Sequence, residues 1–384
     1  MAIQQRLRPP VFGGCHRRRS CPAGPKGAQG AQKRRTEAGV ERARADQELA
    51  GARLRVYPGN DALRPTRDNL TMTSAPTVPS TRMEYCPMCR HRPGVIRHVD
   101  AQDRWFGTPG SWIFRYCPRC SGLWLDPRPT SAALPMLYER YYTHEPVSGH
   151  KERCLWAQLR ARLPWHGCDE AGALGYLTGL PPGRVLDVGC GNGTRMRRLH
   201  LAGWRVFGVD MDPGAVERAR LANLGEVVLG TLEDVEPSTP FDAIVMFHVL
   251  EHLEEPLAAL RRARELLRPG GTLAVATPNA GSCLHRLYGH RWRGLEPPRH
   301  LQIFSLPALQ RLAHDAGFLH VEVLTTARNA GNLALASERS YGKDMSLPLR
   351  VPLLVKSELL QAWQWICLRW NPTCGEELVA IARR

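Results

Sequence analysis

The chain has 384 residues, of which 43% are hydrophobic and 23% are charged, enough to bury one sizeable core and a smaller second one. No fixed period recurs, which excludes collagenous, coiled-coil and repeat proteins. The most apolar stretch, residues 351–370, contains five charged or amide side chains and is too polar for a membrane span. Residues 1–82 hold 16 Lys and Arg against 6 Asp and Glu, a surplus of +10 within the net charge of +16. The remainder is only mildly basic, so a polyanionic partner is not required.

Residues 1–82 are rich in Arg, Ala, Gly and Pro and contain few aromatic or β-branched side chains. Such a segment cannot bury enough apolar area to offset the entropy of ordering it, and we expect a disordered basic tail. Its start lacks acidic residues, as in an organellar transit peptide, but it has no clear amphipathic stripe and no apolar stretch typical of a secretory signal. Met72 and Met83 are alternative natural starts.

Two Cys-x-x-Cys pairs follow, separated by 27 residues: Cys86 with Cys89, and Cys117 with Cys120. Four thiolates in this pattern suit a tetrahedral, structural Zn²⁺ without an open coordination position, and we expect a zinc ribbon over residues 83–128. A redox dithiol and an iron–sulfur cluster are the alternatives. The other cysteines are scattered and too few for a disulfide scaffold, which favours a reducing compartment, the cytoplasm.

The expected ribbon is rich in aromatic side chains and arginines. Aromatic faces combined with positive charge can bind single-stranded RNA. In so small a domain, however, aromatic side chains more often form the only available core, and this is the interpretation we favour. The aromatic residues are Trp105, Phe106, Trp112, Phe114 and Tyr116.

Beyond a helical linker at residues 129–170, with leucines at 155, 159 and 163 at helical spacing, strands and helices alternate. This alternation predicts a parallel α/β sheet over residues 171–384, with an insertion at about 328–376. The expected strands are 184–188, 205–209, 226–229, 242–247, 272–277, 319–326 and 377–382. The expected helices are 193–202, 213–223, 256–267 and one that Ser305 caps and that ends at Gly317.

The strongest motif is a strand that runs into Asp-Val-Gly-Cys-Gly-Asn-Gly at residues 187–193, followed by a helix. Gly189 and Gly191 allow a sharp turn and a close approach to a ligand, and the helix start offers N–H groups. A second acid, Asp210, ends the next strand, where it can accept hydrogen bonds from ribose hydroxyls. A nicotinamide-dependent Rossmann enzyme is disfavoured, because Thr194 stands where its third glycine would be needed. A plain structural corner is the remaining alternative.

These motifs resemble the class I S-adenosylmethionine-dependent methyltransferases over roughly residues 171–384. The resemblance implies a Rossmann-like, seven-stranded sheet whose last strand is antiparallel. It also implies that Met211 lies beside adenine, that Leu232 and Glu233 close on the adenine edge, and that the chain is an enzyme with S-adenosylmethionine as cofactor. The implied cofactor contacts are Asp187, Gly189, Cys190, Gly191, Asp210, Met211, Leu232, Glu233 and Phe247.

Three histidines are candidate catalytic bases: His248 and His252 after the fourth strand, and His300 in the loop before Ser305. A base is needed if the acceptor is a hydroxyl, a phenol or an acidic carbon, and histidine transfers protons near neutral pH. Each could instead fix the local backbone. His-x-x-Glu-His at 248–252 matches an inverted zinc-protease motif, but that motif needs a long helix, whereas this one leaves a strand and meets Pro256.

The loop at 292–305 and the fourth-strand motif are similar to methyltransferases of the ubiquinone pathway and to relatives that act on sugars and natural products. We therefore expect transfer to oxygen or carbon of a small-molecule or sugar-containing biosynthetic intermediate. Alternatives are a zinc-ribbon RNA methyltransferase, with nucleic acid the less favoured partner, and a cofactor-binding protein without chemistry. The sequence does not identify the acceptor or the oligomeric state.

Within the insertion, an apolar stripe at helical spacing predicts a helix over residues 353–370. We expect this face to pack against the sheet or a second subunit. The alternative is a helix on a membrane surface, because Trp and basic residues mark membrane interfaces. The stripe consists of Val355, Leu359, Trp363, Ile366 and Trp370.

Overall fold

The computed structural model describes residues 78–92, 94–138, 163–166, 172–338 and 347–384. Residues 1–77, which include most of the expected basic tail, lie outside this part, as do Leu155 and Leu159 of the expected helical linker. The described residues all belong to one compact unit.

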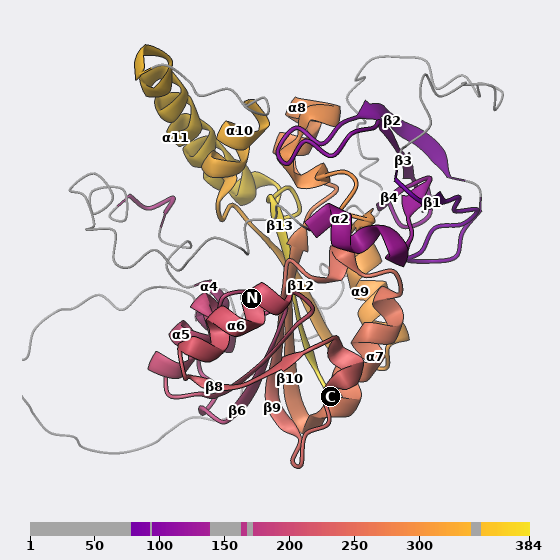
Figure 1. Ribbon diagram of the computed structural model, residues 1–384. Coiled ribbons are helices and arrows are strands. Elements are labelled where there is room, and N and C mark those ends of the chain that lie inside the picture. Colours follow the sequence, from indigo (N-terminus) through magenta and orange to yellow (C-terminus); the bar gives the residue numbers. More distant parts are fainter. Residues whose placement is uncertain (1–77, 93, 139–162, 167–171, 339–346) are drawn as a thin grey trace, which may run out of the picture. The chain divides into compact units, whose positions relative to one another are not determined.

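A seven-stranded sheet forms the centre of this unit, in the order β12-β13-β10-β9-β6-β7-β8 (Figure 1). Neighbouring strands from β8 to β10 are parallel, whereas β13 is antiparallel to both β10 and β12. The expected sheet and its antiparallel last strand are confirmed. The strands are β6 (Arg184–Val188), β7 (Arg205–Asp210), β8 (Gly225–Leu229), β9 (Phe241–Phe247), β10 (Leu267–Pro278), β12 (His320–Thr326) and β13 (Glu377–Arg383).

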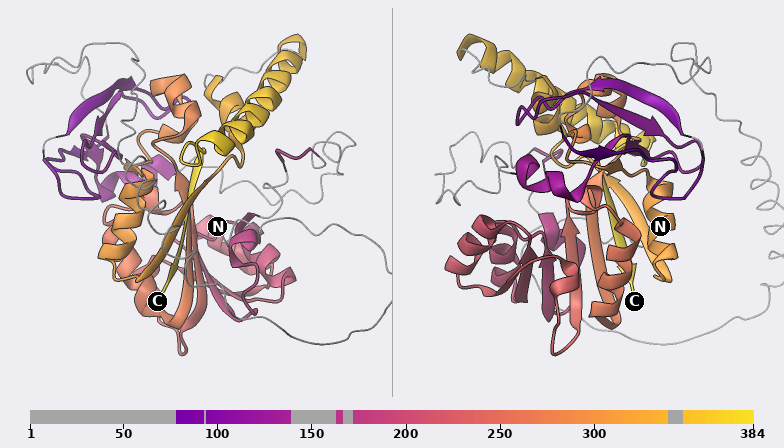
Figure 2. Two further views of the ribbon diagram at one scale, coloured as in Figure 1. Left: turned by 180° about the vertical axis from the view of Figure 1, so that it is seen from behind. Right: turned by 45° about the vertical axis from the view of Figure 1, so that its right-hand side comes forward.

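Helices cover both faces of the sheet, with α4, α5 and α6 on one face and α7 and α9 on the other (Figures 1 and 2). Local signals define their starts: the Asp212 side chain accepts from Gly214 N ahead of α6, and Ser305 accepts from Ala308 N ahead of α9. The predicted cap at Ser305 is thereby confirmed. The helices are α4 (Gly172–Leu177), α5 (Thr194–Leu201), α6 (Pro213–Leu221), α7 (Pro256–Leu266) and α9 (Leu306–Asp315).

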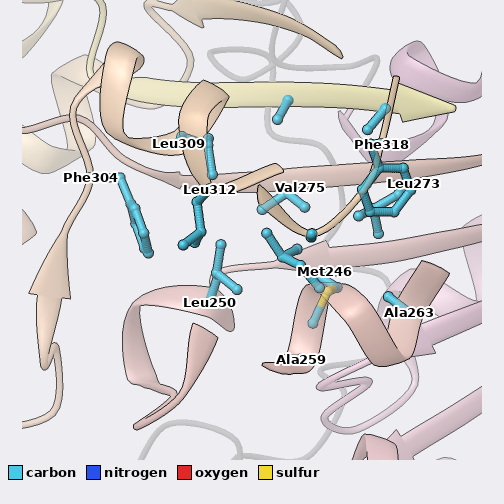
Figure 3. Close-up of a cluster of buried hydrophobic side chains, with 14 of the residues drawn as sticks. Met246, Leu250, Ala259, Ala263, Leu273, Val275, Phe304, Leu309, Leu312 and Phe318 are labelled. Carbon is cyan, nitrogen blue, oxygen red and sulfur yellow. The ribbon is translucent and has the colours of Figure 1, made fainter. Parts of the chain in front are cut away.

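The core between the sheet and the pair α7 and α9 is made of aliphatic and aromatic side chains in close contact (Figure 3). Met246 of β9 and Val275 of β10 face Ala263 of α7 and Leu312 of α9. The strands are buried on both faces, as their near-continuous apolar sequences require for parallel strands covered by helices. The carboxyl ends of β6, β7 and β9 are thereby held at one edge, where ligands bind in open α/β sheets.

The segment with the four cysteines, which we call the Cys module (residues 78–138), forms a second sheet of order β11-β4-β3-β2. Its strands are β2 (Val95–Ala101), β3 (Trp112–Tyr116), β4 (Leu123–Leu125) and, from the other end of the sequence, β11 (Gln302–Ile303). The short β1 (Ser80–Thr81) pairs with β5 (Arg128–Pro129), and α2 (Leu134–Tyr138) follows. Because β1 ends at residue 81 and pairs with β5, the described Cys module includes residues before 83, where the sequence places the start of the ribbon.

The Cys module shares a hydrophobic core with the α/β part. Trp112 and Phe114 are fully buried and pack in one cluster with Leu284, Trp292 and Leu295. This confirms the prediction that these two aromatic side chains form a core. Trp105 and Phe106 instead lie beneath guanidinium groups, with Arg293 5.0 Å from the Trp105 ring centre and Arg299 4.2 Å from that of Phe106. Four aromatic rings that RNA bases could have stacked on are therefore engaged within the protein.

The insertion forms α10 (Ala330–Glu338) and α11 (Leu347–Trp370), which contact each other. The short helix α8 (Cys283–Tyr288) contacts α10. The predicted helix exists, but its apolar stripe does not pack on the sheet, since Leu359 is 66% exposed and Trp370 is 86% exposed. Packing of this stripe against a second subunit stays a prediction. The opposite, polar face is buried instead, because the Gln361 amide donates to Ala327 O and that of Gln364 donates to Cys374 O. In the described part of the chain, no helix is long and apolar enough to cross a membrane.

Candidate active site

The turn between β6 and α5 has the shape that the glycine motif predicted. Gly189 and Gly191 have φ angles of +66° and +54°, which L side chains rarely adopt. A Cβ atom at residue 189 would lie 2.5 Å from Cγ2 of Val249, so the backbone approaches this neighbour as only glycine allows. The backbone N–H groups of Gly189 and Cys190 donate to Val209 O at 2.9 and 3.2 Å. The turn is therefore fixed against the end of β7.

Two acidic side chains lie at the ends of β6 and β7. Asp210 accepts hydrogen bonds from Gly191 N at 2.8 Å and from Asp212 N at 2.9 Å. Asp187 is completely buried and pairs with Arg195 through Oδ1 at 2.7 Å, while its buried Oδ2 has no hydrogen-bond partner among the described residues. Burial raises the pKa of Asp187 to about 6 and that of Asp210 above its ordinary value. A carboxylate oxygen without a donor, beside a glycine turn, fits a ligand with amino and hydroxyl groups such as S-adenosylmethionine.

The other residues expected at the cofactor differ in exposure. Met211 is 50% exposed and Glu233 is also exposed, so both are accessible to a ligand beside the strand ends. Cys190, Leu232 and Phe247 are buried in the two cores on either side of the sheet. The buried Cys190, Leu232 and Phe247 can therefore support the backbone of the site. Met211 and Glu233 can present their side chains to a ligand.

His248 follows β9 with a φ angle of +55° and lies between two carboxylates. Its Nδ1 is 3.2 Å from Glu251 and its Nε2 is 2.9 Å from Glu377. Burial lowers the pKa of His248, but the hydrogen bonds to these carboxylates outweigh it and raise the pKa to about 10. The same pairing, against the effect of burial, lowers the pKa of Glu251 to about 2. The two carboxylates thus favour the protonated form of His248.

His252 and His300 form a second pair, with ring centres 4.6 Å apart in an edge-on arrangement. Nδ1 of His252 lies 3.1 Å from Arg299 O and 2.9 Å from the Tyr138 hydroxyl, and Nδ1 of His300 lies 2.8 Å from Gly294 O. Because Nδ1 of His252 faces a carbonyl oxygen, the neutral ring favours its proton there and its lone pair on Nε2. Nε2 of His300, in contrast, faces the Glu296 carboxylate at 3.6 Å. Burial lowers the pKa of both, to about 4 for His300. Burial therefore favours the neutral form of both rings, and His252 is half-buried whereas His300 is buried.

Buried ion pairs fix the loop that carries His300. The guanidinium of Arg299, 1% exposed, lies 2.7 Å from Asp103 of the Cys module and 3.3 Å from Glu296. Arg293 also pairs with Glu296. Against the effect of burial, these arginines hold the pKa of Glu296 well below that of an ordinary glutamate, so it stays ionised. Since Arg299 O also orients His252, the Cys module helps to position this imidazole.

Ligand atoms of Glu251, His252 and His300 all lie within 4.8 Å of one another. A carboxylate and two imidazoles at this spacing can share a proton or hold a divalent cation. Residues 250–252 form a single 3₁₀ turn, however, and this geometry differs from the long helix of the inverted zinc-protease motif. The interpretation of 248–252 as a protease site is thereby disfavoured, as expected from the sequence.

The four paired cysteines converge on one point. Their sulfur atoms lie within 4.8 Å of one another, with Cys86 3.6 Å from Cys120 and Cys89 3.5 Å from Cys117. Sulfur atoms around a tetrahedral zinc ion, with Zn–S bonds of about 2.3 Å, are about 3.8 Å apart. Burial raises the pKa of Cys89 to about 11, so four ionised thiolates here call for a bound cation. The donor set therefore fits Zn²⁺.

Several residues of this site were not singled out from the sequence. Tyr138, Glu377 and Arg299 contact the histidine candidates from positions 114, 129 and 47 residues away. No local motif marks such partners, because each is near the site only in the folded chain. Arg195 is different: it follows the glycine turn within one helical turn, so the buried Asp187 could have indicated a basic partner there.

Comparisons with known proteins agree with this geometry. The family profile described as Methyltransferase domain matches residues 149–323. A ubiquinone biosynthesis O-methyltransferase of Xanthomonas campestris pv. campestris is 40% identical over 107 residues, 26% of this chain and 45% of that protein. Its counterpart in Xylella fastidiosa is 38% identical over 134 residues, 32% of this chain and 54% of that protein. The chain thus spans about half the length of the curated relatives that it matches.

Among solved structures, a SAM-dependent methyltransferase from Archaeoglobus fulgidus is 18% identical, with 55% of this chain and 89% of that chain covered and a TM-score of 0.38. Phosphoethanolamine N-methyltransferase 2 of Haemonchus contortus is 17% identical, with 55% and 51% covered and a TM-score of 0.39. Likenesses at this level support no detailed comparison. The family profile match over residues 149–323 includes the strands β6 to β10 of the observed sheet and the glycine turn after β6.

Proposed function

We propose that this protein is an S-adenosylmethionine-dependent methyltransferase that acts on oxygen or carbon of a small-molecule biosynthetic intermediate. When bound, the cofactor supplies an electrophilic methyl group. The residues that would hold it are Asp187, Gly189, Gly191 and Asp210, with Met211 and Glu233 at its adenine end. Relatives named as ubiquinone biosynthesis O-methyltransferases support an oxygen acceptor.

The observation that carries the proposal is the state of His252. Its imidazole is neutral, because burial lowers its pKa, and its Nδ1 is held by Arg299 O and the Tyr138 hydroxyl. The lone pair on Nε2 can accept a proton from a hydroxyl or an acidic carbon as the methyl bond forms. His248 contacts Glu251 and Glu377, keeps Glu251 ionised and positions the turn after β9. His300 acts as a neutral neighbour that fixes the loop.

We further propose that the Cys module binds structural Zn²⁺ through Cys86, Cys89, Cys117 and Cys120, a role supported by their mutual distances. All cysteines of the described residues are free thiols, which suits the reducing cytoplasm. The module extends the α/β part through β11 and orders the loop that carries Arg299 and His300.

Cofactor binding tests the proposal most directly. We would titrate S-adenosylmethionine and S-adenosylhomocysteine calorimetrically into the full chain and into Asp210→Asn. Loss of a charged hydrogen-bond acceptor for the ribose is expected to weaken binding about 10- to 100-fold, from about 1.5–3 kcal/mol per such bond. Glu217→Gln is the matched control, since Glu217 is exposed on α6 and carries the same charge. No binding by the folded full chain would contradict the proposal.

A further inference from the structure

The helix α11 carries its apolar stripe on the side opposite to α10. Its other face is fixed by the two buried glutamine amides, and a Cβ atom at Gly331 of α10 would lie only 2.7 Å from Ser357 O. α11 therefore cannot rotate to bury the stripe without breaking these contacts. Figures 1 and 2 show the helix extending away from the seven-stranded sheet. The stripe consists of Val355, Leu359, Trp363, Ile366 and Trp370.

The exposure of the stripe distinguishes it from an ordinary protein surface. Its five side chains are between 42% and 86% exposed and follow one another along a single helix. Apolar side chains scattered over a surface need no explanation, but a continuous row of large ones marks a surface that contacts another molecule. The stripe therefore calls for a partner, and its pattern and surroundings indicate which one.

The pattern of the stripe is nearly the same in both directions along the helix. Val355 precedes Leu359 by four residues, and Trp370 follows Ile366 by four residues, so the row is almost symmetric about Trp363. In an antiparallel pair of two α11 helices, Leu359 would face the partner's Ile366, and the small Val355 would face the partner's Trp370. A two-fold axis between two copies requires a surface that is self-complementary in this way.

The area of the stripe is sufficient for such a pair. At the observed exposures the five side chains offer roughly 600 Å² to a partner, if a whole aromatic side chain counts about 150–250 Å² and an aliphatic one less. Two copies would then remove roughly 1,200 Å² from water, the lower limit for a specific and stable interface. The stripe thus reaches the area that a stable dimer needs.

A membrane surface fits the helix less well. Helices that lie on membranes present lysine and arginine from a polar face to the lipid headgroups. The polar face of α11 is instead buried in the protein. Lys356 pairs with Glu338, and the guanidinium of Arg369 lies 3.4 Å from the ring centre of Trp365. Both cations among residues 354–370, the part of α11 whose side chains the structure describes, are thereby engaged within the chain.

We propose that the apolar stripe of α11 binds a second copy of this chain, as an antiparallel helix pair with its two-fold axis near Trp363. The pair buries the large apolar side chains that the fold leaves exposed, and the glutamine contacts within each copy stay unchanged. The proposal does not depend on the methyltransferase function, because the stripe shares no residue with the cofactor site or the histidine site.

Sedimentation velocity of the full chain at micromolar concentrations tests the proposal. We expect a dimer, and Leu359→Glu should raise its Kd at least about 30-fold, because a carboxylate would be buried against an apolar side chain within the interface. Leu221→Glu is the matched control, since Leu221 is an exposed leucine at the end of α6, and its replacement should leave the dimer unchanged. Unchanged far-ultraviolet circular dichroism would verify that both variants fold.

A double variant tests the antiparallel arrangement. In Leu359→Glu combined with Ile366→Lys, each introduced carboxylate would meet the introduced ammonium group of the other copy, so the dimer should be tighter than with Leu359→Glu alone. In a parallel pair, like charges would meet instead, and association would be weaker still. Absence of any recovery in the double variant would overturn the antiparallel pair.

Three other results would also overturn the proposal. A full chain that stays monomeric without lipid would show that another segment of the same chain covers the stripe. Flotation of a monomeric chain with vesicles of phosphatidylcholine and phosphatidylglycerol, lost in Leu359→Glu, would identify a membrane surface as the partner. A dimer that Leu359→Glu leaves unchanged would place the contact between the copies elsewhere on the molecule.

Discussion

The cofactor side and the acceptor side of this molecule are built over different distances along the chain. The cofactor side, at β6 and β7, is held by short-range bonds: Gly191 N reaches Asp210 across 19 residues and Arg195 reaches Asp187 across 8. The acceptor side joins Tyr138 to His252 across 114 residues. Local motifs therefore describe the first side well and the second poorly.

The Cys module accounts for much of this difference. It contributes Asp103 to the ion pair that fixes Arg299, and its sheet is completed by β11 from beyond the fifth strand of the main sheet. A segment that the sequence predicts as a separate ribbon thus packs against the loop that carries Arg299 and His300. Five variants would break or sharpen this contrast.

Loss of the metal should have the largest effect. Cys117→Ser removes one of four thiolate ligands, and structural zinc contributes about 10–16 kcal/mol to the folding of zinc-finger peptides. We expect loss of bound zinc, measured by elemental analysis, and a single thermal transition at lower temperature, because the cysteines share a core with β9 and α9.

Cys367→Ser is the control for this change, since Cys367 lies on α11 outside the cysteine cluster and should retain zinc. Two separate thermal transitions in Cys117→Ser would show instead that the Cys module folds independently, and the shared-core argument would be wrong.

The next largest effect concerns His252. Once an acceptor has been found by screening, His252→Gln should lower kcat by about 100- to 10,000-fold, the usual range for a lost general base, with cofactor affinity unchanged. Because the pKa of His252 is below its ordinary value of 6.5, kcat/KM should rise with pH and level off below that value.

His320→Gln, an exposed histidine at the start of β12, is the matched control and should leave kcat unchanged. A histidine NMR titration tests the same point without an acceptor. A pKa for His252 above 6.5 would remove the argument that this imidazole is neutral in the folded protein.

Two buried leucines compare the sides directly. Leu186 of β6 and Leu123 of β4 are each 1% exposed, so their replacement by alanine leaves comparable cavities. Each change should lower the free energy of unfolding by about 2–5 kcal/mol in denaturant titrations. Leu123→Ala should also lower methyl-transfer activity, because it disturbs the proposed acceptor site, while the affinity for S-adenosylmethionine stays the same. A stability change confined to Leu186→Ala would indicate that the Cys module adds nothing to the common core.

The smallest effect is expected from His248→Gln. The pKa of His248 is raised from 6.5 unfolded to about 10 folded, so its stabilisation is fully present below 6.5 and is lost as the pH rises through about 10. The side chain is 47% exposed, so we expect at most about 1 kcal/mol. Denaturant titrations should show the variant weaker near neutral pH and equal to the parent near pH 10. A stability difference that does not vary with pH would show that the ion pair with Glu251 and Glu377 contributes nothing.

Sequence patterns alone were sufficient for the sheet and for the turn of the cofactor side. Their signals are local: apolar strands between glycines, Ser305 as a cap, and acids at fixed distances from Gly189. The convergence of the two Cys-x-x-Cys pairs was also predictable, because four thiolates from two turns can bind one tetrahedrally coordinated ion. The histidine candidates were recognised, but not the division of roles among them.

Those roles depend on tertiary structure. Glu377 favours the protonated form of His248, and Arg299 O and Tyr138 orient His252, although none of the three is near these histidines in the sequence. The orientation of α11 was decided in the same way. Apolar periodicity predicted the buried face, but buried amide hydrogen bonds from Gln361 and Gln364 to distant carbonyl groups determine it instead. The sequence by itself determined the elements and the local turns, because their interactions are short-range. Only the tertiary structure decided the protonation states and the exposed faces, because these follow from groups that folding brings together.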